Sequence, residues 1–334
     1  MSGLGVAVVG LGVGEAHARA YLASGCDLRV LYDPDMERAQ RLAAELGAGR
    51  VAPAYEDLLA DPEVAVVSLA SPDDAHFGQA LAALRAGKHV FVEKPLCRSL
   101  DELVALQEAR LAHPSLHLGS NLVLRAAPLY RWVREQVAAC ALGSVYAFDG
   151  DYLYGRLHKI THGWRRDVEA YSVLLGGGIH LVDLMLRITG QRPHSVTAVG
   201  NRISTQGTAF QYADYVAATY EFESGLVGRI SANFGCVQPH QHVVRVFGTE
   251  ATVTYDDQGP RLHESRDPSR APARLDLAAL PPDKGVLIPG FIEAILEGAD
   301  PIPEVEHEFA LIAACAAADR ALEERRRVDI EYCS

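Results

Sequence analysis

The sequence predicts an α/β protein: a doubly wound parallel sheet, followed by an α+β domain with an open, mainly antiparallel sheet. Three observations predict this fold class. A chain of 334 residues favours two domains over one. Through about residue 120, short and continuously apolar runs alternate with amphipathic stretches, which is typical of parallel strands covered by helices on both faces. Beyond that point the apolar runs become long and alternate with polar residues, as in antiparallel sheets.

The first domain is expected to span residues 1–121, with strands and helices in alternation. Its continuously apolar runs predict strands at 5–10, 27–33, 50–52, 64–70, 89–93 and 115–121. Apolar residues three or four positions apart predict the intervening helices at 15–24, 35–46, 55–59, 75–86 and 99–112. Gly87 is expected to end the fourth helix, and Ser99 with Glu102 to form a capping box at the start of the fifth.

The second domain is expected to span residues 122–334. Alternating apolar and polar residues predict strands at 145–154, 195–202, 214–222, 225–234, 242–247, 251–255 and 328–332. Helical spacing occurs at 128–139, 178–188, 291–297 and 308–324, and the last helix is expected to pack back on the first domain. Residues 223–225 (ESG) predict a tight turn, and the segment 267–282, rich in proline and arginine, is expected to be irregular.

The composition argues against several kinds of protein. No apolar run reaches the roughly 18 residues that span a bilayer, so no membrane partner is expected. The N-terminus has neither a basic stretch nor a small-residue cleavage site, which favours a cytoplasmic location. A formal net charge of −12 repels a nucleic-acid backbone. The six cysteines form no C-x-x-C pair, which argues against a zinc knuckle or a disulfide framework.

His240 and His242 are spaced like the histidines of some metal sites. They alternate along an expected strand, however, and the sequence places no carboxylate or cysteine close to them as a further ligand. We therefore interpret both histidines as residues of the sheet surface or of an interface, and we predict no metal.

A glycine-rich turn joins the first expected strand to the first helix. Gly10, Gly12, Val13 and Gly14 lie in it (GLGVGEAH, residues 10–17). Glycines permit a tight turn and a close approach of the backbone to a pyrophosphate, and the N-terminus of the following helix offers free N–H groups. The spacing G-x-G-x-G is one residue shorter than the fingerprint G-x-G-x-x-G, yet its place between strand and helix predicts a dinucleotide-binding loop.

Asp33 ends the second expected strand, 23 residues after Gly10. An acidic residue in this place binds the ribose hydroxyls of the adenosine, and its carboxylate repels a 2′-phosphate. The sequence therefore predicts NAD rather than NADP as the cofactor, although Arg38 follows closely in the next helix. The alternative is a tight turn with a solvated aspartate and no ligand.

Glu93, Lys94 and Pro95 follow a strand in the setting AGKHVFVEKP (residues 86–95). Three further stretches agree with it: GLGVGEAH at 10–17, SPDDAH at 71–76 and GGGIHLVD at 176–183. With these motifs, in this order over nearly its whole length, the chain resembles the glucose–fructose oxidoreductase, inositol dehydrogenase and rhizopine-catabolism (Gfo/Idh/MocA) family. The resemblance implies a Rossmann domain, a substrate domain with an open sheet, NAD(P)-dependent oxidation of a hydroxyl, and assembly into homodimers or homotetramers.

The resemblance also implies roles for single residues. Lys94 corresponds to the lysine that reaches the reacting hydroxyl, and His180 to the histidine that serves as acid and base. Contacts with the cofactor are predicted for Gly10, Gly12, Val13, Gly14, Asp33, Ser71, Pro72, His76, Glu93, Lys94 and Asn121. The family often has an aspartate four residues before that histidine, where this chain has Gly176. Asp183, on the same helical face as His180, is either its replacement or a structural residue.

The expected chemistry suits these residue types. Oxidation of an alcohol removes a hydride from carbon and a proton from the hydroxyl. Histidine, with an ordinary pKa of about 6.5, can take that proton near neutral pH. A desolvated lysine can stabilise the developing alkoxide and relay the proton. We therefore predict Lys94, His180 and Asp183 as catalytic residues. The alternatives are a structural helix histidine and a surface ion pair of the lysine.

Residues 154–166 (YGRLHKITHGWRR) hold four fixed positive charges and no acid, in a chain of net charge −12. Such a reversal of charge beside a candidate active site predicts an anionic substrate, with arginine and lysine as phosphate partners and an aromatic ring stacked on a sugar. Substrate contacts are predicted for Arg125, Tyr154, Arg156, Lys159, Trp164, Arg165 and His180. The alternatives are an exposed loop with scattered ion pairs and, for Arg125 and Asn121, an interdomain hinge.

Together these features predict a sugar dehydrogenase or reductase that uses NAD(P). The most specific hypothesis is a nucleotide-activated or phosphorylated sugar that is oxidised at a ring hydroxyl, such as C3 of a hexose or N-acetylhexosamine. A free sugar or cyclitol is the alternative substrate. A protein of a different class, a cofactor-binding regulator without turnover, is a further alternative, since a fold by itself does not establish a function. The missing aspartate at Gly176 suggests this alternative.

Overall fold

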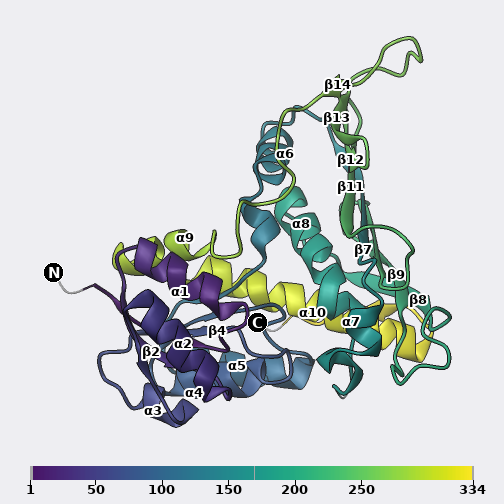
Figure 1. Ribbon diagram of the computed structural model, residues 1–334. Coiled ribbons are helices and arrows are strands. Elements are labelled where there is room, and N and C mark those ends of the chain that lie inside the picture. Colours follow the sequence, from purple (N-terminus) through teal and green to yellow (C-terminus); the bar gives the residue numbers. More distant parts are fainter. Residues whose placement is uncertain (1–2, 169, 333–334) are drawn as a thin grey trace. The chain divides into compact units, whose positions relative to one another are not determined.

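The computed structural model describes residues 3–168 and 170–332 (Figure 1). These residues divide into two compact units. The first unit comprises residues 3–123 with Pro281–Ile312, and the second comprises Leu124–Leu280 with Ala313–Tyr332. Helix α10 (Ile302–Glu324) belongs to both, because the division falls within it. No helix in the described part of the chain is both long enough and apolar enough to cross a membrane.

The first unit contains a six-stranded sheet in which all neighbouring strands are parallel. The strand order is β3 (Arg50–Val51), β2 (Asp27–Tyr32), β1 (Gly5–Val9), β4 (Val66–Leu69), β5 (His89–Val92) and β6 (Leu118–Ser120). The connecting helices are α1 (Gly14–Ala23), α2 (Met36–Leu46), α3 (Tyr55–Leu59), α4 (His76–Arg85) and α5 (Leu100–Leu111). The predicted doubly wound parallel sheet is confirmed, and its strand order reverses between β1 and β4.

The core of the first unit also includes a segment from far along the sequence. Helix α9 (Ile288–Leu296) packs against α1, and its Ile288 and Ile292 are buried in the same apolar cluster as the strands. The ring of Phe291 lies 5.3 Å from that of Phe91 in β5. All five residues of β1 are buried, as the continuously apolar run predicts for a strand covered on both faces.

The second unit contains a nine-stranded sheet. Its order is β14 (Ala273–Arg274), β13 (Gly259–His263), β12 (Thr252–Asp256), β11 (Gln241–Gly248), β7 (Val145–Leu153), β10 (Val227–Asn233), β9 (Tyr215–Glu221), β8 (Ser195–Asn201) and β15 (Val328–Asp329). The β7–β10 pair is parallel and the other described pairs are antiparallel, so the predicted mainly antiparallel sheet is confirmed. The expectation that 267–282 is irregular is wrong at β14, which pairs with β13.

Helix α8 (Ile179–Thr189) covers one face of this sheet, and two glycines in the strands bring it close. A Cβ on Gly228 would lie 2.2 Å from Sδ of Met185, and a Cβ on Gly150 would lie 3.1 Å from Cβ of Leu181. Helix α6 (Pro128–Ala138) packs against α8 in turn. The helix therefore lies directly on β7 and β10, which positions the residues of its first turn.

Helix and turn ends agree with the predictions except in one detail. Ser99 Oγ accepts a hydrogen bond from the N–H of Glu102 at 3.2 Å, as predicted. The Glu102 carboxylate, however, accepts from the N–H of Arg98 at 2.7 Å and not from that of Ser99, so the capping box is shifted by one residue. Gly87 after α4 and Gly225 in the turn between β9 and β10 both adopt positive φ, 73° and 83°, which glycine tolerates without strain.

A buried ion pair ties α8 to the chain that enters the second unit. The guanidinium of Arg125 donates to both oxygens of Asp183, at 2.8 and 2.9 Å, and Arg187 lies 3.5 Å from the same carboxylate. The side chain of Asp183 is fully buried and that of Arg125 is 11% exposed. Arg125 was predicted to contact substrate or to form an interdomain hinge, and Asp183 to orient His180 or to be structural. This pairing gives both residues a structural task.

Replacing Asp183 by asparagine should lower the free energy of unfolding by about 3 kcal/mol, because the Arg125 charge would lose its buried partner. Urea denaturation measures this difference. Asp149→Asn is the matched control: its partner Arg229 is 40% exposed, so the loss should stay below about 1 kcal/mol. Equal losses in the two variants would contradict a stabilising role of the buried pair.

Candidate active site

Each glycine of the loop after β1 has a different steric role. Gly10 has φ 78°, and a Cβ there would lie 2.5 Å from the backbone nitrogen of Ser71. A Cβ on Gly14 would lie 3.0 Å from Cγ1 of Val8, so this glycine lets α1 pack on β1. Around Gly12 no atom lies within 4 Å of the Cβ position, which leaves open space beside the backbone. A tight turn, an open approach and close helix packing are the three tasks of a dinucleotide-binding loop.

The place of this loop in the sheet suits a bound dinucleotide. It follows β1, and the strand order reverses between β1 and β4, where ligands of open α/β sheets bind. The first turn of α1 has no side-chain cap, and the N–H groups of Gly14 and Ala16 donate to the carbonyls of Gly10 and Val13 at 3.2 and 3.0 Å. The positive end of the helix dipole at this turn favours a pyrophosphate. Gly10, Gly12, Val13 and Gly14 therefore fit a nicotinamide dinucleotide.

Asp33 holds the same loop from the end of β2. Its carboxylate is buried and accepts hydrogen bonds from the N–H groups of Leu11, at 2.7 Å, and Asp35, at 2.9 Å. The guanidinium of Arg38 lies 3.3 Å from the same carboxylate. Contact of Asp33 with the ribose of a cofactor stays a prediction. The structure places the guanidinium of Arg38 beside the Asp33 carboxylate.

The predicted cofactor residues after β4 are tied to the loop that follows Lys94. The ring nitrogens of His76 lie 2.9 Å from the carbonyl oxygen of Ser71 and 2.7 Å from that of Pro95. The carbonyl of Pro72 accepts from the N–H of Ala75 at 3.0 Å, which closes the turn before α4. These contacts fix the carboxyl end of β4 relative to that of β5. The peptide bond between Lys94 and Pro95 is cis.

Glu93 and Asn121 belong to a network that includes a histidine missed in the sequence. Asn121 Nδ2 donates to Glu93 Oε1 at 2.7 Å and to the carbonyl of Lys284 at 2.8 Å. His17 in α1 lies between them: Nε2 is 3.3 Å from Glu93 Oε1, and Nδ1 is 3.0 Å from Ser68 Oγ. The buried face of α1, which includes residues 14, 17, 18 and 21, was the signal that could have placed His17 toward the sheet.

This network keeps Glu93 charged beside Lys94. Burial alone would raise the pKa of Glu93, but the bonds and charges of His17, Asn121 and Lys94 together lower it to about 2. Lys94 is half-buried and directly follows β5, at the carboxyl end of a parallel strand. The first unit thus presents a lysine beside a fixed carboxylate on the edge of the sheet where the glycine loop also lies.

Glu93→Gln tests the network through pH. A group whose pKa is lower in the folded chain stabilises the fold above its unfolded pKa, and this stabilisation is lost as the pH falls toward the folded value. Given the shift from 4.5 to about 2, the wild-type free energy of unfolding should fall between pH 6 and pH 3 by about 2 kcal/mol more than that of the variant. Urea denaturation at both pH values measures this, and parallel pH dependences would count against the network.

In the second unit a π-helix (Leu174–Gly178) leads into α8 and was not predicted. Ser172 Oγ accepts from the N–H groups of Leu174 and Leu175, each at 3.1 Å, and donates to the half-buried Asp319 at 2.8 Å. A Cβ on Gly177 would lie 2.2 Å from Cε1 of Tyr152, so the ring packs directly on the helix backbone. Short π-helical turns often occur at functional sites, and this one ends just before His180.

The imidazole of His180 lies in a cluster of aromatic rings. Its centroid is 6.3 Å from that of Tyr152 and 5.9 Å from that of His242, and His240 lies 4.8 Å from His242. His242 was interpreted as a residue of the sheet surface or of an interface, and the first alternative is wrong: it pairs opposite Tyr152 in the sheet and is 7% exposed. Burial, followed by the charges of His180, His240 and Arg156, holds the pKa of His242 well below its usual value.

The three histidines of this cluster do not form a metal centre. Within the described ranges, no group of three or more histidine, cysteine, aspartate or glutamate residues has the geometry to hold a metal ion. Period-two spacing alone could not reveal the cluster, because His180 comes from a helix 60 residues before His240 and His242.

The basic segment after β7 divides into paired and unpaired cations. Arg166 forms an ion pair with Asp167 at 2.8 Å, and Arg165 lies 4.5 Å from the ring centroid of Trp164. Arg156 and Lys159 are exposed, and no described acid lies within ion-pair distance of either.

Arg156 is connected to the histidine cluster through two stacked tyrosines. Its guanidinium lies 5.6 Å from the ring centroid of Tyr154, which stacks on Tyr152 at 6.0 Å. Tyr152 in turn contacts His180. The cation of Arg156 is therefore connected to the surroundings of the candidate base by a continuous series of contacts.

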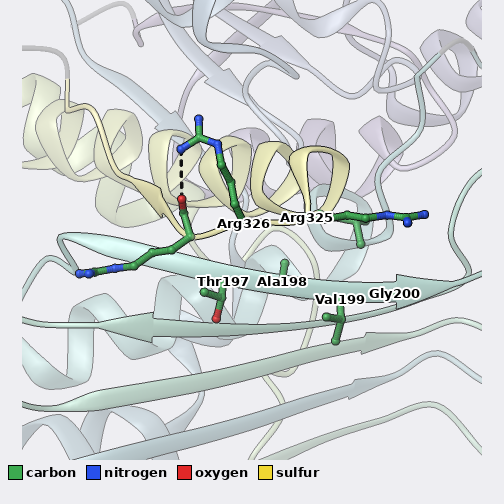
Figure 2. A pocket seen from close by; sticks show the side chains of 8 residues that line it. Thr197, Ala198, Val199, Gly200, Arg325 and Arg326 are labelled. Carbon is green, nitrogen blue, oxygen red and sulfur yellow. Dashed lines mark hydrogen bonds between the residues drawn. The ribbon is translucent and has the colours of Figure 1, made fainter.

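A pocket of about 350 Å³ lies elsewhere in the second unit (Figure 2). It is lined by residues of β8, by the last turn of α10 and by the chain after it, namely Thr197, Ala198, Val199, Gly200, Leu322, Arg325, Arg326 and Arg327. Arg326 donates to the carbonyl of Arg327 at 3.3 Å, as the dashed line marks. None of the residues predicted for the active site lines this pocket.

A parallel sheet with a dinucleotide loop, and a second sheet that carries a histidine on its covering helix, define a nicotinamide-dependent oxidoreductase. Comparison with known proteins agrees. Residues 4–115 match the model of an oxidoreductase family with an NAD-binding Rossmann fold, and residues 130–254 match the GFO/IDH/MocA C-terminal domain. The chain belongs to the GFO/IDH/MocA oxidoreductase family, a family of NAD(P)-dependent dehydrogenases of sugars and cyclitols. The resemblance inferred from the motifs is confirmed.

Several curated relatives are about equally similar. A scyllo-inositol 2-dehydrogenase (NAD(+)) of Bacillus subtilis (strain 168) is 30% identical over 257 residues, 74% of this chain and 72% of that one. A UDP-N-acetylglucosamine 3-dehydrogenase of Acidithiobacillus ferrooxidans is 30% identical over 258 residues, 77% and 75% of the two chains. A 1,5-anhydro-D-fructose reductase of Ensifer adhaerens is 30% identical over 224 residues, which span 64% of each chain.

Solved structures share the fold over the full length. An oxidoreductase domain protein from Kribbella flavida gives a TM-score of 0.87 at 23% identity, over 99% of this chain and 100% of that one. Levoglucosan dehydrogenase in complex with NADH and L-sorbose gives 0.86 at 21% identity, over 98% and 99% of the two chains. At these identities the likeness establishes the fold alone.

Proposed function

We propose that the protein is an NAD-dependent dehydrogenase that oxidises a ring hydroxyl, such as that at C3, of a nucleotide-activated or phosphorylated sugar. The observation that carries the substrate class is the pair of exposed cations Arg156 and Lys159, which have no acidic partner in the described chain. Phosphate groups are bound by such cations through charge-assisted hydrogen bonds.

The proposed chemistry is assigned to Lys94 and His180. In the proposed reaction the hydroxyl proton passes to the imidazole of His180, while Nζ of Lys94 donates a hydrogen bond to the oxygen and stabilises its developing negative charge. When bound at Gly10, Gly12, Val13 and Gly14, the cofactor supplies a nicotinamide that accepts the hydride. In the reverse direction His180 returns the proton to the oxygen of a ketone.

The cofactor proposed is NAD. Asp33 places a buried carboxylate at the end of β2, where it would repel a 2′-phosphate. Arg38 lies 3.3 Å from that carboxylate and weakens the argument, since a guanidinium could bind the same phosphate. The Bacillus subtilis relative carries NAD(+) in its name, and levoglucosan dehydrogenase was solved with NADH, which supports NAD.

The relatives support two substrate classes. The Acidithiobacillus ferrooxidans relative acts on a UDP-sugar by its name, whereas the Bacillus subtilis relative acts on an inositol. The unpaired Arg156 and Lys159 favour the charged class over the free sugar or cyclitol. The carbon that reacts is proposed by analogy with the UDP-sugar relative alone.

We also propose that the protein forms a homodimer or homotetramer in the cytoplasm. The face of the second sheet that lies opposite α8 supports self-association. It is half-exposed and carries an ordered charge network, in which Arg229 pairs with Asp149 and Asp151, each at 3.1 Å.

A cofactor-reduction screen tests the proposed activity. Purified protein is incubated with NAD or NADP and with UDP-sugars, sugar phosphates, free sugars or inositols, and reduced nicotinamide is measured by absorbance. We expect reduction of NAD with an anionic sugar, and a loss of about 100-fold or more in kcat for Lys94→Ala and for His180→Ala. Activity on uncharged polyols only would favour the cyclitol class, and undiminished activity of either variant would contradict its role.

The double variant Arg156→Ala/Lys159→Ala tests the substrate charge. Loss of two unpaired cations should raise KM for the anionic sugar by about tenfold or more, because each charge-assisted hydrogen bond contributes about 1.5–3 kcal/mol. The dissociation constant of NADH should not change. Arg166→Ala is the matched control, since Arg166 is neutralised by Asp167 in the same segment. Equal KM values in wild type and double variant would contradict the proposal.

A further inference from the structure

The pocket shown in Figure 2 lies where β15 ends beside β8. Strand β15 has two residues, which pair with the first two residues of β8. Residues 197–200 of β8 continue past it, and on this side of the strand residues 325–327 line the pocket with them. A Cβ on Gly200 would lie 3.1 Å from Cδ1 of Leu322, so this leucine forms one wall. All of these residues belong to the second unit.

The lining of this pocket combines apolar groups with three successive arginines and contains no acid. Ala198, Val199 and Leu322 supply the apolar surface, and the side chain of Val199 is 70% exposed. A volume of about 350 Å³ lies at the small end of the range for pockets that bind organic ligands. The pocket therefore suits a small molecule that has an apolar body and a negative group.

Two of the three arginines are neutralised by acids outside the lining. Arg327 forms an ion pair with Glu221 at 3.0 Å, and Arg326 forms one with Glu324. Among residues 3–168 and 170–332, none lies within hydrogen-bond or ion-pair distance of the Arg325 guanidinium. Figure 2 shows the side chains of Arg325 and Arg326 extending in different directions from the chain. The pocket thus carries one uncompensated positive charge, in a protein of net charge −12.

The backbone of Arg325 adopts a conformation that usually belongs to glycine. Arg325 directly follows α10 and has φ 53°, in the left-handed region. Gly47 after α2 and Gly190 after α8 hold the same place with φ 63° and 66°, whereas Cys140 after α6 is, like Arg325, an exception with φ 56°. A side chain with a Cβ is strained in this region, so an arginine here costs stability that glycine would not. Such an outlier is a reason to seek a use for the side chain.

We propose that this pocket binds a small organic monocarboxylate. The carboxylate pairs with the guanidinium of Arg325, whose parallel N–H groups match its two oxygens. The apolar body of the ligand lies against Val199 and Leu322. A monoanion matches the single uncompensated cation, whereas a phosphate dianion would stay half neutralised. Because none of the residues predicted for the active site lines this pocket, the inference is independent of the proposed function.

Saturation-transfer NMR on the full chain tests the ligand class at low ionic strength, where exposed charges are least screened. The probes are hexanoate, its uncharged counterpart hexanamide, and acetate, which has the charge without the apolar body. We expect hexanoate to bind with a dissociation constant below about 1 mM, and each of the other two to bind about tenfold more weakly or worse. Equal binding of hexanoate and hexanamide, or no binding of hexanoate, would overturn the proposal.

Arg325→Gly assigns the binding to the pocket. It should weaken hexanoate binding about tenfold or more and yet raise the midpoint of thermal unfolding by about 2 °C, because glycine tolerates the left-handed conformation. This gain in stability separates the loss of binding from a loss of fold. Arg326→Ala is the matched control: it removes a neutralised guanidinium from the same pocket, so hexanoate should bind within about twofold of the wild-type affinity.

Two other results would overturn the proposal. Unchanged hexanoate binding in Arg325→Gly would place the carboxylate elsewhere on the protein. A smaller assembly of Arg325→Gly than of the wild type in sedimentation, with no hexanoate bound by the wild type, would assign the pocket to an acidic side chain of a second copy of this chain.

Discussion

Direct packing of aromatic rings and backbone against glycine is the constraint on which the cofactor loop of the first unit and the surroundings of His180 in the second unit both depend. At Gly10 the loop after β1 touches the backbone of Ser71, and at Gly176 and Gly177 two phenol rings touch the π-helix. Any Cβ at these positions would overlap its neighbours at 2.2–2.5 Å. Because glycine has no Cβ, neighbouring atoms can pack directly against its backbone at these positions. This close packing shapes the cofactor loop in the first unit and the surroundings of His180 in the second.

The distribution of charged residues in the two units is consistent with the proposed substrate. In the first unit Glu93 is held as a carboxylate by His17 and Asn121, which gives Lys94 an adjacent anion. In the second unit the nearest acid on α8, Asp183, is committed to Arg125, and the rings around His180 are neutral tyrosines and histidines. Arg156 and Lys159 have no acid within ion-pair distance among the described residues, which is the electrostatic basis of the proposed anionic substrate.

Local patterns predicted the parts of this fold that depend on neighbours in sequence: the parallel strands, the glycine loop, the Ser99 cap and most strands of the second sheet. They failed where partners are far apart along the chain. His17 meets Glu93 and Asn121, which are 76 and 104 residues away, and Arg125 meets Asp183 across 58 residues. The π-helix was missed because a widened turn leaves no periodic signature over five residues, and the packing of Tyr171 on Gly176 because a glycine does not reveal what fills the space beside it.

Transfer of deuterium from a sugar to the nicotinamide tests the central claim most directly, namely that the chain moves a hydride from a ring carbon. The anionic sugar that supports reduction is prepared with deuterium on one ring carbon at a time, and the reduced cofactor is analysed by mass spectrometry. The account predicts one deuterium in the reduced nicotinamide from a single labelled carbon, with C3 the expected position. Release of the label to water, or its retention in the sugar from every position, would contradict hydride transfer as the reaction of this protein.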